Sequence, residues 1–552
     1  MYQARHRSLS GFYRAILPSL FLILSQGCST ADKGIPVDIV SFPDFSVTLD
    51  IGPPAPVDLG SVPDTAPDIY EVDAGPPPWK PSLGPGLVYA SEAMDDEASL
   101  SLAWNQSESG TEVTNLGAAY RLVFEFTSQN FLGEPWVHKA FLYIPDDLFL
   151  KQEHSLAIIE QGVLMPEEQG RELFRKSYAL EASVAFDVPV MVVEGLIPDG
   201  LRYPSEAISG SSAACLDTPL TEEDFIRCGF ALVQETKDLT LSPFLPAGRV
   251  FLRAALAASA MVAQVQAVRP ELKLTELAPK QLIFSGEGLA GMGAKMALAS
   301  HEDASAAMSV GAELVDVENL ALVMSQVWSD GGTWLESGVL SNSLATDWGR
   351  EHADLYDVMR FSSELTGKRL VIGVGTNDPR FPLGATELYA KYLPAEQIMV
   401  YADNTEEGIA DARYQGAWRA LLDRALNGAP VPKAVVSTEE DPTGYLRVQA
   451  AIVGCQAVDS TCHEVRAYVV SYHMTLVDHD YRDAVWVEVP MTRDPLSTGG
   501  AGWYGLLDPA SLPSHNAFFV QITDLVDNQL RYTSSGLSFI SQPYPEPSGG
   551  SN

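Results

Sequence analysis

The stretch "KQLIFSGEGLAGMGAKMALA", Lys280 to Ala299, determines which fold the surrounding chain adopts. It begins with a short apolar run that ends at Ser285, as a buried strand would. From Leu289 onward, small and apolar residues recur at helical spacing. The stretch therefore predicts a strand, a tight turn and a helix, with Gly288 at the apex of the turn.

Further strands and helices alternate on both sides of this stretch, between about Leu87 and Pro430. Several strand candidates are nearly continuous apolar runs, as fully buried parallel strands require. Long helical patterns lie between them, so an α/β sheet with helices on both faces is expected. The remaining strand candidates are "YRLVFEFTSQ" (120–129), "HKAFLYIP" (138–145), "SLAIIEQG" (155–162), "VPVMVVEG" (188–195), "KRLVIGVGTND" (368–378) and "QIMVYADN" (397–404).

The character of the sequence changes after "GAPVPK" (428–433). From Ala434 to about Pro545, segments of alternating polarity follow one another without a long helical pattern. This pattern is typical of an antiparallel β-sandwich. The expected fold class is thus a doubly wound α/β sheet followed by a C-terminal β-sandwich.

The N-terminus has the three parts of an export signal. Three arginines precede the apolar run "AILPSLFLIL" (15–24), which is too short to span a bilayer, and "LSQGC" then ends at Cys28. A small residue before a cysteine at this place resembles a bacterial lipobox, so Cys28 is expected to carry lipid. Secretion without an anchor stays open. Ser29 follows instead of an aspartate, which favours the outer membrane of a bacterial cell envelope.

A proline- and aspartate-rich segment follows the signal, from Ser29 to about Gly86. Such a segment repels itself and lacks backbone donors at its prolines, so it is expected to be an extended tether. The expected domains are 1–28 signal peptide, 29–88 tether, 89–431 α/β domain, 432–546 β-sandwich domain and 547–552 tail. The net charge of −37 disfavours nucleic acid and anionic membrane surfaces as partners.

The other four cysteines form two close pairs in the sequence, Cys215 with Cys228 and Cys455 with Cys462. An exported protein meets an oxidising compartment, so two disulfides that close short loops are expected. A zinc site is the competing interpretation. Neither a CxxC motif nor histidine-rich spacing accompanies these cysteines.

Four segments carry a resemblance to a known family: "FTSQNFLGEPWVHKAFLYIP" (126–145), "EEDFIRCGFALVQETKDLTLSPFLPAGRVFLRAAL" (222–256), "DLYDVMRF" (354–361) before a strand, and "HDYRDAVWVEV" (479–489). In this order the chain from about Ala90 to Pro545 resembles the PhoPQ-activated pathogenicity-related proteins. The resemblance implies an α/β-hydrolase domain with a serine, an acid and a histidine as catalytic triad, followed by a β-rich part.

The resemblance also assigns the triad positions, and two of them lack the side chain that the reaction needs. The nucleophile position falls on Gly288, the acid on Asp378 and the histidine on Glu407. A serine hydrolase needs an attacking hydroxyl and a neighbouring base. Backbone amides for an oxyanion, expected from Leu289 and from Gly162 after the strand at 155–162, cannot replace them.

Other side chains are weak substitutes for the missing groups. Ser285 lies three residues before the apex, where the pleat aims it elsewhere, and Ser211 lacks the flanking strand and helix. His301, His352 and His479 are each expected to be surface or packed histidines rather than displaced bases.

Three classes of function therefore stay open. The first is a catalytically inactive protein of this fold that binds a small molecule or another protein at the cell envelope, with no cofactor. The second is a hydrolase with a carboxylate or hard-cation site built from Glu287, Asp378 and Glu407. The third is a structural envelope protein in which the β-sandwich is the active part.

Overall fold

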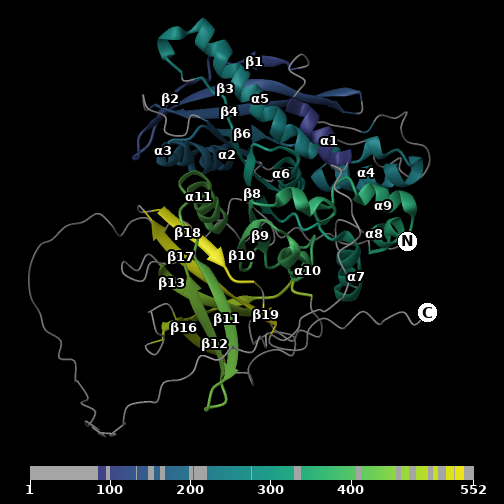
Figure 1. Ribbon diagram of the computed structural model, residues 1–552, viewed down its shortest axis with the longest axis vertical. Helices are drawn as coiled ribbons and strands as arrows, with labels where there is room; N and C mark the ends of the chain where they lie inside the picture. Colours follow the sequence, from purple (N-terminus) through teal and green to yellow (C-terminus); the bar gives the residue numbers. More distant parts are fainter. Residues whose placement is uncertain are drawn as a thin grey trace, which may run out of the picture. The chain divides into compact units, whose positions relative to one another are not determined.

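A computed structural model describes the chain from residue 85 to residue 539 with gaps (Figure 1). All described residues belong to one unit, Ala66–Asn552. The expected signal peptide, Cys28 and most of the expected tether lie outside them. The described residues are 85–94, 100–131, 133–146, 154–161, 168–197, 203, 221–274, 276–328, 337–405, 412–454, 462–470, 480–494, 502–507, 517–526, 529–536 and 538–539.

The expected α/β sheet is present, and its strands follow the order β1-β3-β4-β6-β5-β7-β8-β9-β10, with β2 beside β3. Neighbours from β6 to β10 are parallel, whereas β1, β3, β4 and β6 pair antiparallel. The apolar runs therefore predict burial well but not strand direction. The strands are β1 Leu102–Trp104, β2 Gly110–Val113, β3 Ala118–Phe131, β4 Glu134–Pro145, β5 Ser155–Gln161, β6 Val190–Glu194, β7 Gln281–Glu287, β8 Ala304–Val310, β9 Arg369–Gly375 and β10 Glu396–Ala402.

Helices cover both faces of this sheet, which is why its central strands are apolar on both sides. Alternate residues of β5 enter two different cores: Ile158 packs in the cluster that contains α5 and α6, and Ile159 in the cluster that contains α11. The main helices are α1 Pro85–Ser91, α2 Glu168–Phe174, η3 Arg175–Leu180, α3 Glu181–Phe186, α4 Glu222–Thr236, α5 Leu245–Val268, α6 Leu289–Ser300, α7 Val317–Val327, α8 Ser337–Leu344, α9 Asp347–Ala353, η8 Val358–Leu365, α10 Ala385–Tyr389 and α11 Ala412–Asn427. Four short 3₁₀ turns are η1 Glu92–Met94, η6 Leu239–Leu241, η7 Pro270–Leu272 and η9 Ala390–Tyr392.

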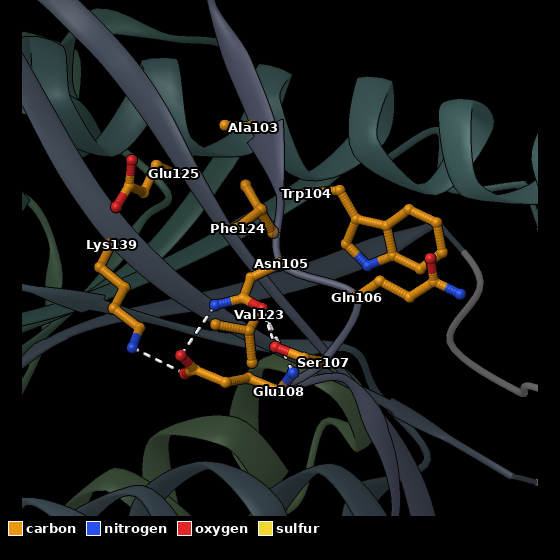
Figure 2. A pocket seen from close by; sticks show the side chains of 10 residues that line it. All are labelled: Ala103, Trp104, Asn105, Gln106, Ser107, Glu108, Val123, Phe124, Glu125 and Lys139. Atoms are coloured by element: carbon orange, nitrogen blue, oxygen red, sulfur yellow. Dashed lines mark hydrogen bonds and ion pairs between the residues drawn. The ribbon is translucent and has the colours of Figure 1, made fainter.

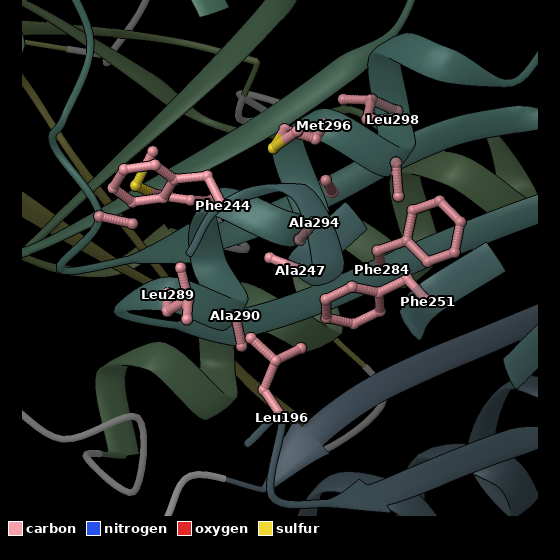
Figure 3. Packing of buried hydrophobic residues seen from close by; sticks show 14 of the residues in the cluster. Leu196, Phe244, Ala247, Phe251, Phe284, Leu289, Ala290, Ala294, Met296 and Leu298 are labelled. Carbon is pink, nitrogen blue, oxygen red and sulfur yellow. The ribbon is translucent and has the colours of Figure 1, made fainter. Parts of the chain in front are cut away.

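Helix α6 is the helix predicted from Leu289 onward, and every one of its residues is buried. It packs against α5 and β7, where Ala247, Phe251 and Phe284 surround its apolar side chains (Figure 3). The helices approach closely, since a Cβ on Gly293 would lie 2.6 Å from the carbonyl oxygen of Ala247. The close contact holds the N-terminal turn of α6 at a fixed place above the sheet.

Helix α5 is long and apolar enough to cross a membrane, and it is the only such helix among the described residues. However, 61% of its most apolar stretch is buried inside the protein. Its contacts with α6, α1 and β3 are those of a core helix.

The C-terminal strands are antiparallel, as expected, but they do not all form a separate sandwich. Strands β18, β17, β13 and β14 extend the α/β sheet beyond β10, where Met399 pairs with Ser534. A second sheet has the order β11-β12-β16-β15. The C-terminal strands are β11 Lys433–Glu440, β12 Leu446–Val453, β13 Cys462–Val470, β14 Trp486–Pro490, β15 Thr492–Arg493, β16 Gly502–Leu507, β17 Ala517–Val526, β18 Gln529–Ser534 and β19 Ser538–Phe539.

These two layers share an apolar core of their own. Val448, Ala450 and Ile452 of β12 contact the cluster that contains Phe518 and Val520 of β17. Sandwich-like packing is therefore present, with one layer continuous with the main sheet. The domain boundary at residues 431 and 432 stays a prediction.

Candidate functional site

The apex of the turn between β7 and α6 has the geometry expected of a strand-to-helix elbow. Gly288 has φ +56° and ψ −123°, a conformation that side chains of L-residues rarely adopt. Its N–H donates to the carbonyl of Val310 at 2.9 Å, which fixes the turn to the end of β8. The geometry resembles the strained elbow that exposes a nucleophile in hydrolases, yet the residue here has no side chain.

The space above Gly288 is occupied by the carboxylate of Glu222. A Cβ placed on Gly288 would overlap Oε1 of Glu222 and lie 3.3 Å from its Cδ. The same Oε1 accepts a hydrogen bond of 2.7 Å from the N–H of Leu289. Leu289 is the residue expected to stabilise an oxyanion, so its amide is already in use.

Glu222 reaches this place because helix α4 begins there. Thr221 caps the helix, accepting a hydrogen bond from the N–H of Asp224 at 3.1 Å. Glu222 is the first helical residue and is only partly buried. Its negative charge lies at the N-terminus of α6, where the free amides and the helix dipole favour an anion.

Among the described residues, Asp378, the expected triad acid, is hydrogen-bonded by an arginine and not by a histidine. Arg380 donates three hydrogen bonds to its carboxylate, from the backbone N at 2.7 Å and from Nε and Nη2 at 3.1 Å each. Both side chains are buried. The Nη1 atom of Arg380 lies 3.3 Å from the Cβ position of Gly288, so Arg380 connects the acid to the elbow.

The carboxyl group of Glu160 lies near those of Glu222 and Glu287. Burial raises the pKa of Glu160 well above its usual value, and the charges of Glu222 and Glu287 raise it further. Glu160 Oε1 accepts a hydrogen bond from the N–H of Leu196 at 3.1 Å, and its Oε2 has no hydrogen-bond partner among the described residues. The protonated form of Glu160 is therefore favoured.

The described candidates for a substitute nucleophile or base lie elsewhere. Ser285 is fully buried in β7, and its Oγ has no hydrogen-bond partner within the part of the chain that the structure describes. His352 is fully buried and hydrogen-bonded through Nε2 to Ser242 Oγ at 2.8 Å, while burial lowers its pKa to about 3. His301 accepts a local hydrogen bond from Asp303 N at 3.2 Å.

A segment of the C-terminal part is held against the turn that carries Asp378. The side-chain amide of Asn377 donates to the carbonyls of Arg482 at 3.0 Å and Ala484 at 2.6 Å. Asn404, after β10, exchanges hydrogen bonds of 2.9 and 2.7 Å with the backbone of Trp486. The segment "DYRDAVW" (480–486) therefore lies at the carboxyl ends of β9 and β10.

A separate shallow pocket of about 430 Å³ lies on β1, β3 and β4 (Figure 2). Trp104 lines one side, and Glu125 and Lys139 line the other. Glu108 also lines the pocket and forms an ion pair of 2.7 Å with Lys139. None of the elbow residues contributes to it.

The structure thus brings Gly288, Leu289 and Asp378 to one site, linked by two residues that the sequence did not indicate, Glu222 and Arg380. The other predicted positions, Gly162, Glu407, Ser211, His479, Cys215 and Cys455, lie outside the described residues.

The predictions for metal ligands and cysteines are also only partly covered by the described residues. No group of three metal-ligating side chains occurs among the residues that are described. Cys228 is buried and disulfide-bonded, and its pairing with Cys215 stays a prediction. Cys462 opens β13.

Similar solved structures include acetyl xylan esterases from Thermoanaerobacterium sp. (12% identity, 58% of this chain and 88% of that one, TM-score 0.35) and Paenibacillus sp. R4 (12%, 60% and 92%, TM-score 0.37), and a glucuronoyl esterase from Solibacter usitatus (9%, 58% and 86%, TM-score 0.32). No curated protein matches the chain. The family model of PhoPQ-activated pathogenicity-related proteins matches residues 102–462. Together with the mixed sheet and the elbow at Gly288, this match shows that the chain has an α/β-hydrolase-like fold and belongs to the PhoPQ-activated pathogenicity-related protein family.

Proposed function

We propose that this protein is a catalytically inactive member of its family that binds a small-molecule or protein ligand at the bacterial cell envelope. The observation that carries the proposal is the carboxylate of Glu222 in the space above Gly288. An elbow without a side chain cannot form an acyl-enzyme. A carboxylate bonded to the Leu289 amide also competes with the oxyanion that a hydrolase would have to stabilise.

The pairing of Asp378 supports the same proposal. In a triad the acid orients a histidine and stabilises its charged form. Here the hydrogen bonds that Asp378 accepts within the described residues all come from Arg380. The acid therefore balances a buried arginine, a structural role that does not need a histidine.

The test is labelling of the purified protein by a fluorophosphonate probe, together with hydrolysis of p-nitrophenyl acetate. We expect neither labelling nor turnover above the uncatalysed background, with an intact serine esterase as positive control. Ester hydrolysis that disappears in Ser285→Ala would refute the proposal, because it would identify a displaced nucleophile.

The envelope location rests on the N-terminal sequence. We propose that Cys28 is lipidated and anchors the chain to the membrane. In fractionated cells, Cys28→Ser should move the protein from the membrane to the soluble fraction. Mass spectrometry that finds an unmodified N-terminus elsewhere would contradict the anchor.

A second candidate function is acid–base chemistry by carboxylates. It is favoured by one observation, the raised pKa of Glu160 beside the charge of Glu222, because a proton donor and an acceptor in one site are the elements of such chemistry. Any turnover that depends on them should be lost in Glu222→Gln and resist the fluorophosphonate probe.

A further inference from the structure

We propose that the first turn of α6 and the guanidinium of Arg380 form a binding site for the carboxylate group of a monoanionic ligand. In the structure Glu222 fills this site as an internal stand-in for the ligand. The inference deepens the proposed binding function and rests on it, since it names the chemistry of the ligand.

The first donor is the backbone amide of Leu289, which binds Oε1 of Glu222 at 2.7 Å. Leu289 opens a helix of 12 residues that is buried along its whole length. Its amide cannot be satisfied within the helix, so an oxygen from outside must accept it. The absence of a side chain on Gly288 lets that oxygen approach the turn closely.

The second group is Arg380, which is 3% exposed. Its Nε and Nη2 bind Asp378, and Nη1 points to the same region as the Glu222 carboxylate. Both Nη1 and Cδ of Glu222 lie 3.3 Å from the position a Cβ would take on Gly288. A helix terminus and a buried cation thus converge on one carboxylate, the arrangement that charge-assisted recognition uses.

The surrounding charges favour a singly charged ligand. Asp378 lies on the far side of Arg380, and the buried Glu160, whose protonated form is favoured, lies near both Glu222 and Glu287. A phosphate dianion would bring a second negative charge close to the carboxylate of Asp378 and would be disfavoured. Glu222 is partly exposed, so rotation of its side chain would open the site to solvent.

The test removes the side chain of Glu222 and adds acetate, a small carboxylate, in its place. Glu222→Ala and the control Glu223→Ala, an exposed neighbour on the same helix, are titrated with sodium acetate at constant ionic strength, with sodium chloride and phosphate as comparison salts. We expect saturable acetate binding by calorimetry in Glu222→Ala, at least about tenfold tighter than in the unaltered protein, where Glu222 competes as an intramolecular ligand. The melting temperature of Glu222→Ala should rise with acetate and not with chloride.

Two further variants test the site itself. In the Glu222→Ala background, Arg380→Gln should abolish acetate binding. Because that change also leaves Asp378 without its partner, Gly288→Ala is the second variant, whose methyl group takes the place of the ligand. Equal responses of Glu222→Ala and Glu223→Ala, or equal effects of acetate, chloride and phosphate, would mean an adventitious ion only and overturn the inference. Acetate is not a substrate for hydrolysis, so acetate binding does not depend on whether the protein is an enzyme. Ester hydrolysis by the protein would refute the proposed inactivity and would leave the acetate-binding result unchanged.

Discussion

The N–H of Leu289 and the carboxylate of Glu222, which are 67 residues apart in the sequence, meet at 2.7 Å beside Gly288. This contact joins the start of α4 to the start of α6. It places a negative charge at the one point of the fold where a hydrolase develops negative charge during catalysis. Restoring a serine alone would therefore not restore a hydrolase site.

Gly288→Ser is expected to remain inactive and to destabilise the protein by roughly 1–3 kcal/mol, because φ is positive and the new side chain overlaps Glu222. Urea unfolding measures the change. Gly367→Ser is the matched control, since Gly367 also has positive φ (+76°) but nothing within 4 Å of its Cβ position. If both variants lose the same stability, the overlap with Glu222 has no energetic weight.

Asp378→Asn should reduce the free energy of unfolding by about 3–5 kcal/mol, because it removes the carboxylate charge that faces the buried guanidinium of Arg380. The comparison is Asp347→Asn, which breaks an ion pair whose acidic side chain is 94% exposed. That variant should show a change too small to resolve. Similar losses in the two variants would show that the buried pair has no special importance.

Acid stability should depend on His352, whose pKa falls to about 3 in the folded protein from 6.5 in the unfolded chain. Between these values the unfolded state binds more protons, so stability decreases as the pH falls, by up to about 1.4 kcal/mol per pH unit for this group. His352→Gln should therefore lose stability less steeply between pH 6.5 and pH 4 in urea unfolding.

The pKa of Asp357 is raised to about 6, which gives a dependence of opposite sign. The contribution of Asp357 is present in the unaltered protein and in His352→Gln, so it cancels when their pH dependences are compared. Parallel curves for the two proteins would contradict the role of His352.

Cys228, which is buried and disulfide-bonded, should be paired with Cys215. Peptide mapping without reduction should recover this pair, and Cys228→Ala should cost roughly 2–3 kcal/mol of stability through the freed loop. A crosslink from Cys228 to Cys455 or Cys462 instead would show that the close spacing in the sequence misled the assignment.

The elbow could be predicted from the sequence because its signals are local. A short apolar run, a glycine and a helical period specify β7, Gly288 and α6 within twenty residues. Glu222 and Arg380 had no such signal. Glu222 belongs to a helix start whose acidic residues are common at helix N-termini in general. Its position at the elbow depends on how α4 packs, which no local pattern encodes.

The C-terminal strands illustrate the same limit. Alternating polarity predicts each strand and its buried face, as in β12. It does not specify which sheet a strand joins. That choice is made by pairs such as Met399 with Ser534, which lie far apart in the sequence.

The continuation of the main sheet through β18 has a consequence for any shortened form of the protein. Strand β10 is covered at its outer side by β18, and the N–H of Tyr401 donates to Ser534 Oγ at 3.1 Å. A chain that ends after α11 would leave β10 as a bare edge, with unpaired backbone groups ready to join another molecule. The C-terminal strands thus act as a shield against aggregation, whatever ligand the protein binds.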